Sequence, residues 1–273
     1  MKLNLKKKKS KTCVYIFLSL TLIVILYSYF NQSNVYENFE NYNNIELVIA
    51  RYNENLNWLK DDPFNRYPSI VYNKGNNDEF YKGSNIKSTI KLNNVGKCDH
   101  TYLYHIISHY DDLANMTLFI PGSLDMKFKY DKAKRLLSEV ENHNDTVFIG
   151  NKHENVKKEL YNFALDNWKT SNEINAVLNP ETKIEHASIR PFGKWYEAHF
   201  PNVKSDFISY SGIIAISRAD IIKHPKSYYE DLIKELDKTS NPEAGHYFER
   251  AWHAIFYPYN NAKFIEGFLN RRA

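Results

Sequence analysis

Short apolar runs alternate with amphipathic stretches along most of this chain, and the alternation limits the folds open to it. The apolar runs are typical of buried strands, and the stretches between them carry apolar residues at helical spacing. Strands are predicted at 45–50, 69–72, 117–120, 146–149 and 213–216. Helices are predicted at 100–110, 132–140, 156–168, 218–222, 227–236 and 242–256. Such an order predicts an α/β domain whose mostly parallel sheet is covered on both faces.

The composition fits one such domain. The chain has 273 residues, of which 43% are hydrophobic and 25% charged, so it can bury a core and is not a disordered or collagen-like chain. Cys13 and Cys98 are its two cysteines, which excludes a small disulfide scaffold. Residues 31–44 are polar and rich in Asn, and they are interpreted as a stem that precedes a single domain over 45–273.

Positive charge is concentrated at the start of the chain. Residues 1–12 hold six lysines and no acid, and subtracting these six from the net charge of +4 leaves the remainder near −2. A protein that binds nucleic acid carries its positive charge on the folded domain. The charge pattern therefore predicts no nucleic-acid partner.

Residues 13–30 predict a membrane anchor. They carry no charge and consist mainly of Val, Ile, Leu and Phe, each of which favours insertion by roughly 0.3–0.6 kcal/mol. A stretch of about 17 residues is enough to span the hydrocarbon core. A cleaved signal peptide is the alternative, but no small-residue cleavage site follows the stretch. The sequence favours a single-pass type II protein with residues 1–12 in the cytosol and its domain lumenal (ER or Golgi) or external.

Polar residues follow the first predicted strand. Ligands of open α/β sheets bind beyond the carboxyl ends of the strands, so Arg51, Asn53 and Glu54 are candidates for contact with a nucleotide. The alternative is an ordinary strand–turn–helix in which Asn53 caps the helix.

The second and third strands are followed by further candidates. Asn73, Lys74 and Gly75 form a turn in which the lysine could meet a phosphate and the glycine allows a left-handed backbone, although a plain turn has the same composition. Asp125 follows the strand at 117–120, where a carboxylate could hold Mg²⁺ or Mn²⁺ against a diphosphate. Because position 123 is Ser, the segment is not a D-x-D motif.

Two histidines lie four residues apart in the helix predicted at 100–110. His105 and His109 could chelate a metal from one helical face, but the glutamate of the H-E-x-x-H motif is missing. The favoured interpretation is a surface pair beside Asp111 and Asp112.

The last predicted helix has two faces. His246, Glu249, Arg250 and His253 share one side at helical spacing. One interpretation is a solvated face. The other is an acid–base site in which Glu249 is the general base, His253 positions its carboxylate and Arg250 lies beside it.

The segments IARYNENLNWL, VYNKG, NVGKCDHTYLYHIISHYDDL and ERAWHAIF, in this order, resemble a family of fungi and large DNA viruses known as a domain of unknown function. The resemblance covers roughly residues 45–256. Members of that family look like "ARYNE..WL", "YNKG", "GRE.HTYL.HI...YD.L", "FLQ.HP.D" and "E..WH.IF". This chain departs from them at Lys97-Cys98-Asp99, where Arg-Glu is typical, and at residues 120–123.

A more distant resemblance is to glycosyltransferases with a single Rossmann-like (GT-A) domain. The opening strand with Tyr-Asn-Glu looks like their nucleotide-sugar strand, and YSGIIAISR looks like their acceptor-side segment. The resemblance implies a membrane-anchored enzyme with a nucleotide-sugar donor and an acceptor that is not identified. The diphosphate would be neutralised either by a metal, Mn²⁺ or Mg²⁺, or by basic groups. The alternatives are a non-catalytic surface or virion glycoprotein and a metal-dependent hydrolase that uses the His/Glu stripe.

Overall fold

The computed structural model describes residues 44–143, 145–178 and 183–267, together with 21–24 and 26–28. The last two segments are helical. Within the described residues, no helix has the length and apolar character needed to cross a membrane. Residues 1–20, 25 and 29–43 lie outside the described part, so the predicted cytosolic tail, most of the anchor and nearly all of the stem stay predictions.

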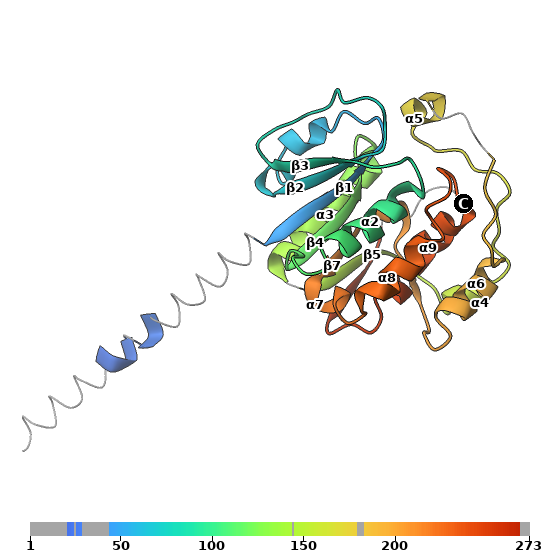
Figure 1. Ribbon diagram of the computed structural model, residues 1–273. Helices are drawn as coiled ribbons and strands as arrows, with labels where there is room; N and C mark the ends of the chain where they lie inside the picture. The colour runs from blue at the N-terminus through green and yellow to red at the C-terminus, as the bar shows by residue number, and fades with distance from the viewer. Residues whose placement is uncertain (1–20, 25, 29–43, 144, 179–182, 268–273) are drawn as a thin grey trace, which may run out of the picture. The chain divides into compact units, whose positions relative to one another are not determined.

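One mixed sheet forms the centre of the domain (Figure 1). The strand order is β3-β2-β1-β4-β7-β5-β6, and β8 also pairs with β5. The strands are β1 (Ile45–Arg51), β2 (Ser69–Asn73), β3 (Ile86–Lys91), β4 (Met116–Pro121), β5 (Thr146–Lys152), β6 (Phe207–Ile208), β7 (Ile214–Ser217) and β8 (Ala262–Glu266).

The sheet is mostly parallel, as the sequence predicts. Strands β3, β2, β1 and β4 are parallel neighbours, and β8 is parallel to β5. Strand β7 is antiparallel to both β4 and β5, and the short β6 is antiparallel to β5. The chain therefore passes through β7 in the opposite direction between two parallel groups of strands.

Both faces of the sheet are covered because successive strand residues point to opposite sides. In β1, Val48 packs in a core with the helices α2, α6, α8 and α9, whereas Leu47 and Ile49 pack in a second core with α3 and two 3₁₀ turns. The 3₁₀ turns are η1 (Asn57–Lys60) and η2 (Phe64–Arg66). The result is three layers, with the sheet in the middle.

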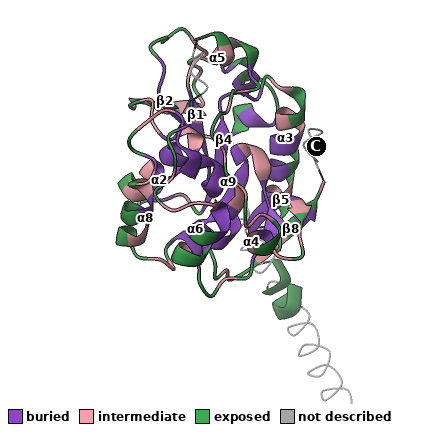
Figure 2. Cartoon of the chain, turned by 90° about the vertical axis from the view of Figure 1, so that its right-hand side faces the viewer, coloured by how far each residue is buried: buried purple, intermediate pink, exposed green. Residues whose placement is uncertain are grey.

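The helices differ in how far they are buried. They are α2 (Lys97–Ser108), α3 (Lys127–Asn142), α4 (Val156–Glu159), α5 (Glu173–Leu178), α6 (Phe192–His199), α7 (Arg218–Ile221), α8 (Lys226–Ile233) and α9 (Glu243–Ile255). A third 3₁₀ turn, η3 (Tyr210–Gly212), precedes β7. Figure 2 shows α9 almost wholly buried, whereas α8 exposes one side. In α9, all residues except Glu249 and Arg250 are buried, so the interpretation of a solvated face is wrong.

The predicted strands and most predicted helices are present, but residues 156–168 form a helix only as far as Glu159. Beyond that point the backbone is bound to distant segments. The carbonyls of Tyr161 and Phe163 accept hydrogen bonds from the start of α6, and the N–H of Leu165 donates to the Glu243 carboxylate at 2.9 Å. These tertiary partners replace helical hydrogen bonds that the apolar spacing alone favours.

Candidate functional site

A pocket with a volume of about 240 Å³ opens at the carboxyl ends of the parallel strands. Residues that follow β1 and β4 line it, and the strand order reverses between these two strands. This is the place where open α/β sheets bind ligands. The lining also includes the first residues of α2, Lys129 of α3, residues of the 160–191 segment and Gly245, His246 and Glu249 of α9.

Four lysines lie in or behind this pocket. Lys74, Lys97 and Lys129 line it, and Lys132 is buried on the same face of α3. All four donate hydrogen bonds to neutral acceptors. Lys74 donates to main-chain carbonyls, and Lys132 donates to a main-chain carbonyl and to the Ser209 hydroxyl. Lys97 donates to a histidine nitrogen, and Lys129 donates to a hydroxyl. Among the described residues, none of the four forms an ion pair with a carboxylate.

Burial lowers the pKa of each of these ammonium groups. The pKa of Lys74 and of Lys97 falls to about 8 and that of Lys132 to about 7, and the pKa of Lys129 is also lowered. The charge of Glu249 opposes this effect at Lys97, Lys129 and Lys132. A bound anion would raise these pKa values further, because it would lie beside ammonium groups that form no ion pair among the described residues.

Lys97 is held by two aromatic rings. Its ammonium group lies 3.5 Å from the ring centroid of Trp168 and donates a hydrogen bond to Nε2 of His246 at 2.5 Å. Burial, with the charges of Lys97 and Arg250, lowers the pKa of His246 to about 2, so the ring is neutral and its nitrogen can accept. The lysine is thus fixed at the pocket wall rather than free in solvent.

The backbone is strained at two points of the lining. Lys97 has φ 51° and Ser211 has φ 76°, and they are two of three non-glycine residues with positive φ in the described chain. Such conformations cost about 1–3 kcal/mol and gather at functional sites. Here they set the start of α2 and the turn that faces Glu249.

Glu249 is the predicted catalytic residue that the structure places in the pocket. Its Oε1 accepts a hydrogen bond from the N–H of Ser211 at 2.7 Å, and its Oε2 lies 3.5 Å from a guanidinium nitrogen of Arg250. Its side chain retains 26% exposure, so solvent and ligands can reach it. The carboxylate is therefore oriented and accessible, as a general base requires.

Arg250 and His253, the other predicted catalytic residues, are not among the residues that line the pocket. The guanidinium of Arg250 stacks 3.9 Å from the ring of Phe163. The ring of His253 is buried against Phe148 and Phe264, and burial lowers its pKa to about 4. The four residues predicted to share one side of this helix are thus divided: His246 and Glu249 line the pocket, whereas Arg250 and His253 do not.

Asp99 adds a buried carboxyl group at the start of α2. Its Oδ1 accepts from the indole N–H of Trp252 at 3.0 Å, and its Oδ2 lies 3.7 Å from the Cys98 sulfur. Burial and the charge of Glu249 raise its pKa to about 7, against the opposing effect of Lys97. The group belongs to the same electrostatic cluster as the pocket lysines.

Arg51 and Asn73, predicted to contact a nucleotide, hold loops together. Arg51 is 1% exposed. Its Nε donates to the carbonyl of Glu54 at 2.7 Å, and one terminal nitrogen donates to Oδ1 of Asn73 and to the carbonyl of Asn77, both at 2.6 Å. Its guanidinium carbon lies 4.2 Å from the ring centroid of Phe80. Although Arg51 lines the pocket, most of its donors are used within the fold.

Glu54 also lines the pocket and organises the loop after β1. Its Oε2 accepts from the backbone N–H groups of Tyr52 and Asn53 at 2.7 and 3.1 Å, and its Oε1 accepts from the Asn175 amide at 2.7 Å. Asn53 itself caps no helix, because η1 begins after Leu56. The interpretation of Asn53 as a helix cap is therefore wrong.

Gly75 is required for a reason other than the predicted one. It does not have a positive φ. Instead, a Cβ at this position would lie 1.7 Å from the carbonyl oxygen of Tyr52. The glycine allows the turns after β1 and β2 to pack together, which keeps Lys74 at the pocket wall.

Asp125 and the histidine pair lie elsewhere. Asp125 is exposed and does not line the pocket, although its charge acts on Lys129. His105 is fully buried and its Nδ1 lies 3.0 Å from the Tyr72 hydroxyl, so the prediction of a surface pair is wrong for this residue. His109 is partly exposed beside Asp112, as predicted. Within the described residues, no three His, Cys, Asp or Glu side chains gather to hold a metal ion.

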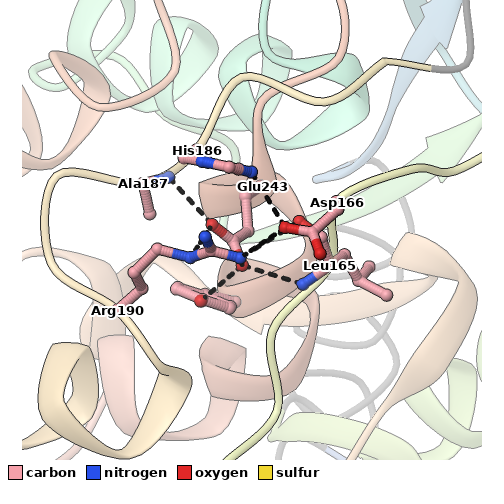
Figure 3. A network of polar contacts seen from close by, with 7 residues as sticks. Leu165, Asp166, His186, Ala187, Arg190 and Glu243 are labelled. Atoms are coloured by element: carbon pink, nitrogen blue, oxygen red, sulfur yellow. Dashed lines mark hydrogen bonds and ion pairs between the residues drawn. The ribbon is translucent and has the colours of Figure 1, made fainter.

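The 160–191 segment reaches the pocket through Trp168, Thr170 and Asn175. A buried carboxylate, Glu243, fastens this segment to the first turn of α9 (Figure 3). Its oxygens accept hydrogen bonds from the N–H groups of Leu165 and Ala187, from the Arg190 guanidinium and from the Tyr247 hydroxyl. Asp166 and His186 extend the network toward solvent. The network sets where the pocket segment lies.

A family model described as "Protein of unknown function (DUF3431)" matches residues 47–264. The chain belongs to this family. The match spans the whole sheet apart from its outermost residues, and it includes every residue that lines the pocket. Neither the curated proteins nor the solved structures give a significant match to this DUF3431 chain.

Of the lysines that line this DUF3431 pocket, the sequence analysis identifies Lys74 but not Lys97 or Lys129. Lys97 is noted only as a departure from the family pattern, Lys129 precedes the helix predicted at 132–140, and Trp168 is the last residue of the helix predicted at 156–168. The signal that could have found Lys97 is the sequence Gly-Lys at the start of a predicted helix that follows a turn. Trp168 could not be found in this way, because the irregular segment that carries it is positioned by Glu243, 75 positions further along the chain.

Proposed function

We propose that this protein is a glycosyltransferase-like enzyme that uses a nucleotide-sugar donor and a hydroxyl acceptor. The observation that carries the proposal is one pocket, at the carboxyl ends of β1 and β4, that brings Glu249 near lysines which form no ion pair with a carboxylate among the described residues. Parallel strands in the order 3-2-1-4 support a Rossmann-like donor site there, as in the GT-A resemblance.

The chemistry follows from these groups. The acceptor hydroxyl oxygen forms a bond to the anomeric carbon while the bond from that carbon to the diphosphate oxygen breaks. The hydroxyl proton passes to the carboxylate of Glu249, and the electron pair of the broken bond goes to the diphosphate. The pocket lysines stabilise that negative charge.

A divalent cation fits the described carboxylates poorly. Both oxygens of Glu54 already accept hydrogen bonds, and Asp99 accepts from Trp252. Glu249 accepts from the N–H of Ser211 and lies beside the Arg250 guanidinium, and Asp125 lies outside the pocket lining. We therefore derive the step through the lysines and not through Mn²⁺ or Mg²⁺.

The proposal is tested by incubating the purified chain with a panel of nucleotide-sugars, with Mn²⁺ and with EDTA. Thermal shift reports donor binding, and release of the nucleoside diphosphate reports turnover. We expect at least one donor to raise the melting temperature and to be consumed. Binding without consumption across donors and hydroxyl acceptors would favour the alternative of a non-catalytic binding module, and no binding at all would refute the proposal.

The proposed layout includes the type II anchor over residues 13–30. Six lysines precede this stretch and no comparable cluster follows within about 15 residues. Protease added outside sealed vesicles after cell-free translation is expected to spare residues 31–273. Digestion of that part would show that the anchor is reversed or absent.

A further inference from the structure

Two of the four pocket lysines retain two N–H donors each for a ligand. An ammonium group has three N–H donors. Lys97 gives one to His246, and Lys129 gives one to the Ser123 hydroxyl at 2.7 Å. Each lysine therefore has two donors left.

The other two lysines serve the fold. Lys74 donates to the carbonyls of Val95 and Lys97, and Lys132 donates to the Tyr210 carbonyl and to the Ser209 hydroxyl. Both are less than 7% exposed, and Lys132 is not part of the lining. Each of them therefore keeps one N–H donor, and their positive charge contributes to the field in the pocket.

The positions of Lys97 and Lys129 add a second source of positive potential. Lys97 is the first residue of α2 and Lys129 lies in the first turn of α3, and these helices have 12 and 16 residues. A helix N-terminus carries a partial positive charge and favours phosphate groups. Helix α2 starts at the pocket, because Cys98 and Asp99 line it beside Lys97. Of the first turn of α3, Lys129 lines the pocket, beside Ser123 of the preceding loop.

We propose that Lys97 and Lys129 together form a diphosphate subsite, so that this protein binds the diphosphate of its donor without a divalent cation. The inference rests on the proposed function for the identity of the donor. The subsite itself rests on the two lysines, their four remaining donors and the lack of a carboxylate partner for either one in the described chain.

The test measures binding of inorganic pyrophosphate and of nucleoside diphosphates to the full chain by calorimetry, in EDTA and in Mn²⁺. We expect affinities in the two conditions to agree within about threefold. Lys97→Met and Lys129→Met should each weaken binding by about tenfold or more, which is the order of one lost charge-assisted contact.

The matched control is Lys127→Met, which removes an exposed lysine of the same helix that pairs with Asp131. This variant should bind as the wild type does. Lys129→Arg keeps the charge and should restore part of the affinity that Lys129→Met loses. Circular dichroism of each variant confirms folding, and Lys129→Arg keeps the test decisive if a methionine variant does not fold.

The results separate the inference from the proposed function. Pyrophosphate binding in EDTA that depends on Lys97 and Lys129 supports the subsite even if no sugar is transferred. Turnover of a nucleotide-sugar that requires Mn²⁺ and is unchanged in both methionine variants would overturn the subsite while leaving the proposed function intact.

Discussion

Helix α9 contacts two clusters of charged groups that are built in opposite ways. At its first residue, Glu243 is 0% exposed, and both of its carboxylate oxygens accept hydrogen bonds, including that from the Arg190 guanidinium (Figure 3). One and two turns further on, His246 and Glu249 face a pocket whose lysines have neutral partners. The first region balances its charge within the fold, and the second does not.

The difference indicates which region is structural and which is functional. Removing a charge from water costs several kcal/mol unless a partner compensates it. Evolution of stability alone would pair the pocket lysines with acids, as Glu243 is paired. Lysines in a pocket that form no ion pair with a carboxylate of the described chain are instead suited to a ligand that brings negative charge.

The largest expected effect concerns the pocket end of α9. Glu249→Gln keeps the shape of the side chain but removes the base, so we expect turnover to fall by roughly 10²–10⁴-fold while donor affinity stays within about threefold. Steady-state kinetics and calorimetry measure the two quantities.

His253→Ala is the control for that substitution, because His253 lies on the same helix but is buried against Phe148 and Phe264. We expect it to lower the melting temperature while leaving the turnover of the folded fraction near wild type. Normal turnover of Glu249→Gln in an active preparation would show that the base lies elsewhere.

The second effect concerns the compensated end of α9. Glu243→Ala leaves two backbone N–H groups without their acceptor and removes the buried partner of the Arg190 guanidinium, which keeps only its contacts with Asp166 and the Leu165 carbonyl. We therefore expect the free energy of unfolding to fall by about 3 kcal/mol or more. Urea denaturation measures it. Asp166→Asn removes only the exposed end of the network and should change stability far less. Equal losses in the two variants would contradict the distinction between the two ends.

The third effect is a dependence of anion binding on pH. Burial lowers the pKa of Lys97 to about 8. The charges of Glu249, Asp99 and Cys98 raise this pKa, and the charge of Arg250 lowers it. The neutral ring of His246 also faces the ammonium group. The ammonium group is charged below pH 8 and neutral above, and an anion binds the charged form. Affinity for pyrophosphate should therefore fall as the pH rises through the pKa of Lys97, and the loss of charge on Lys74, whose pKa is also about 8, adds to this decrease.

Calorimetry from pH 7.5 to pH 9.5 measures this decrease. Lys97→Arg places a group there that stays charged throughout the range, so the decrease should become shallower in this variant. If affinity fell as steeply with pH in Lys97→Arg as in the wild type, Lys97 would not belong to the subsite.

The sequence was a good guide where local pattern and burial agree. The runs at 45–50 and 117–120 are apolar on both faces, and both are central parallel strands. Strand β3 was missed because neither of its faces is fully buried. Ile86, Ser88 and Ile90 lie on its half-buried face, and polar residues lie on its exposed face. Strand β8 was missed because its pairing with β5 spans more than a hundred residues.

The candidate site was less predictable because tertiary packing decides what each side chain contacts. Glu249 and Lys74 were placed correctly at the pocket by helix spacing and by the rule for strand ends. The same rules could not show that Arg51 is bound by three carbonyl groups and the Asn73 side chain, or that His253 turns into an aromatic cluster. Each depends in part on a remote segment: Asn73 and Asn77 for Arg51, and Phe148 for His253.

The smallest expected effect concerns Asp125, which separates a lysine-based site from a metal-based one. Asp125 is exposed and lies outside the pocket lining, and its charge reaches the pocket only through its effect on Lys129. If lysines hold the diphosphate, Asp125→Asn removes a weakly repulsive charge, and affinity should stay within about twofold of wild type, with any change toward tighter binding. A metal held by Asp125 predicts the opposite sign, namely weaker binding and a lost response to Mn²⁺. Titration of pyrophosphate into Asp125→Asn with and without Mn²⁺ therefore distinguishes the two by the direction of the change as well as by its size.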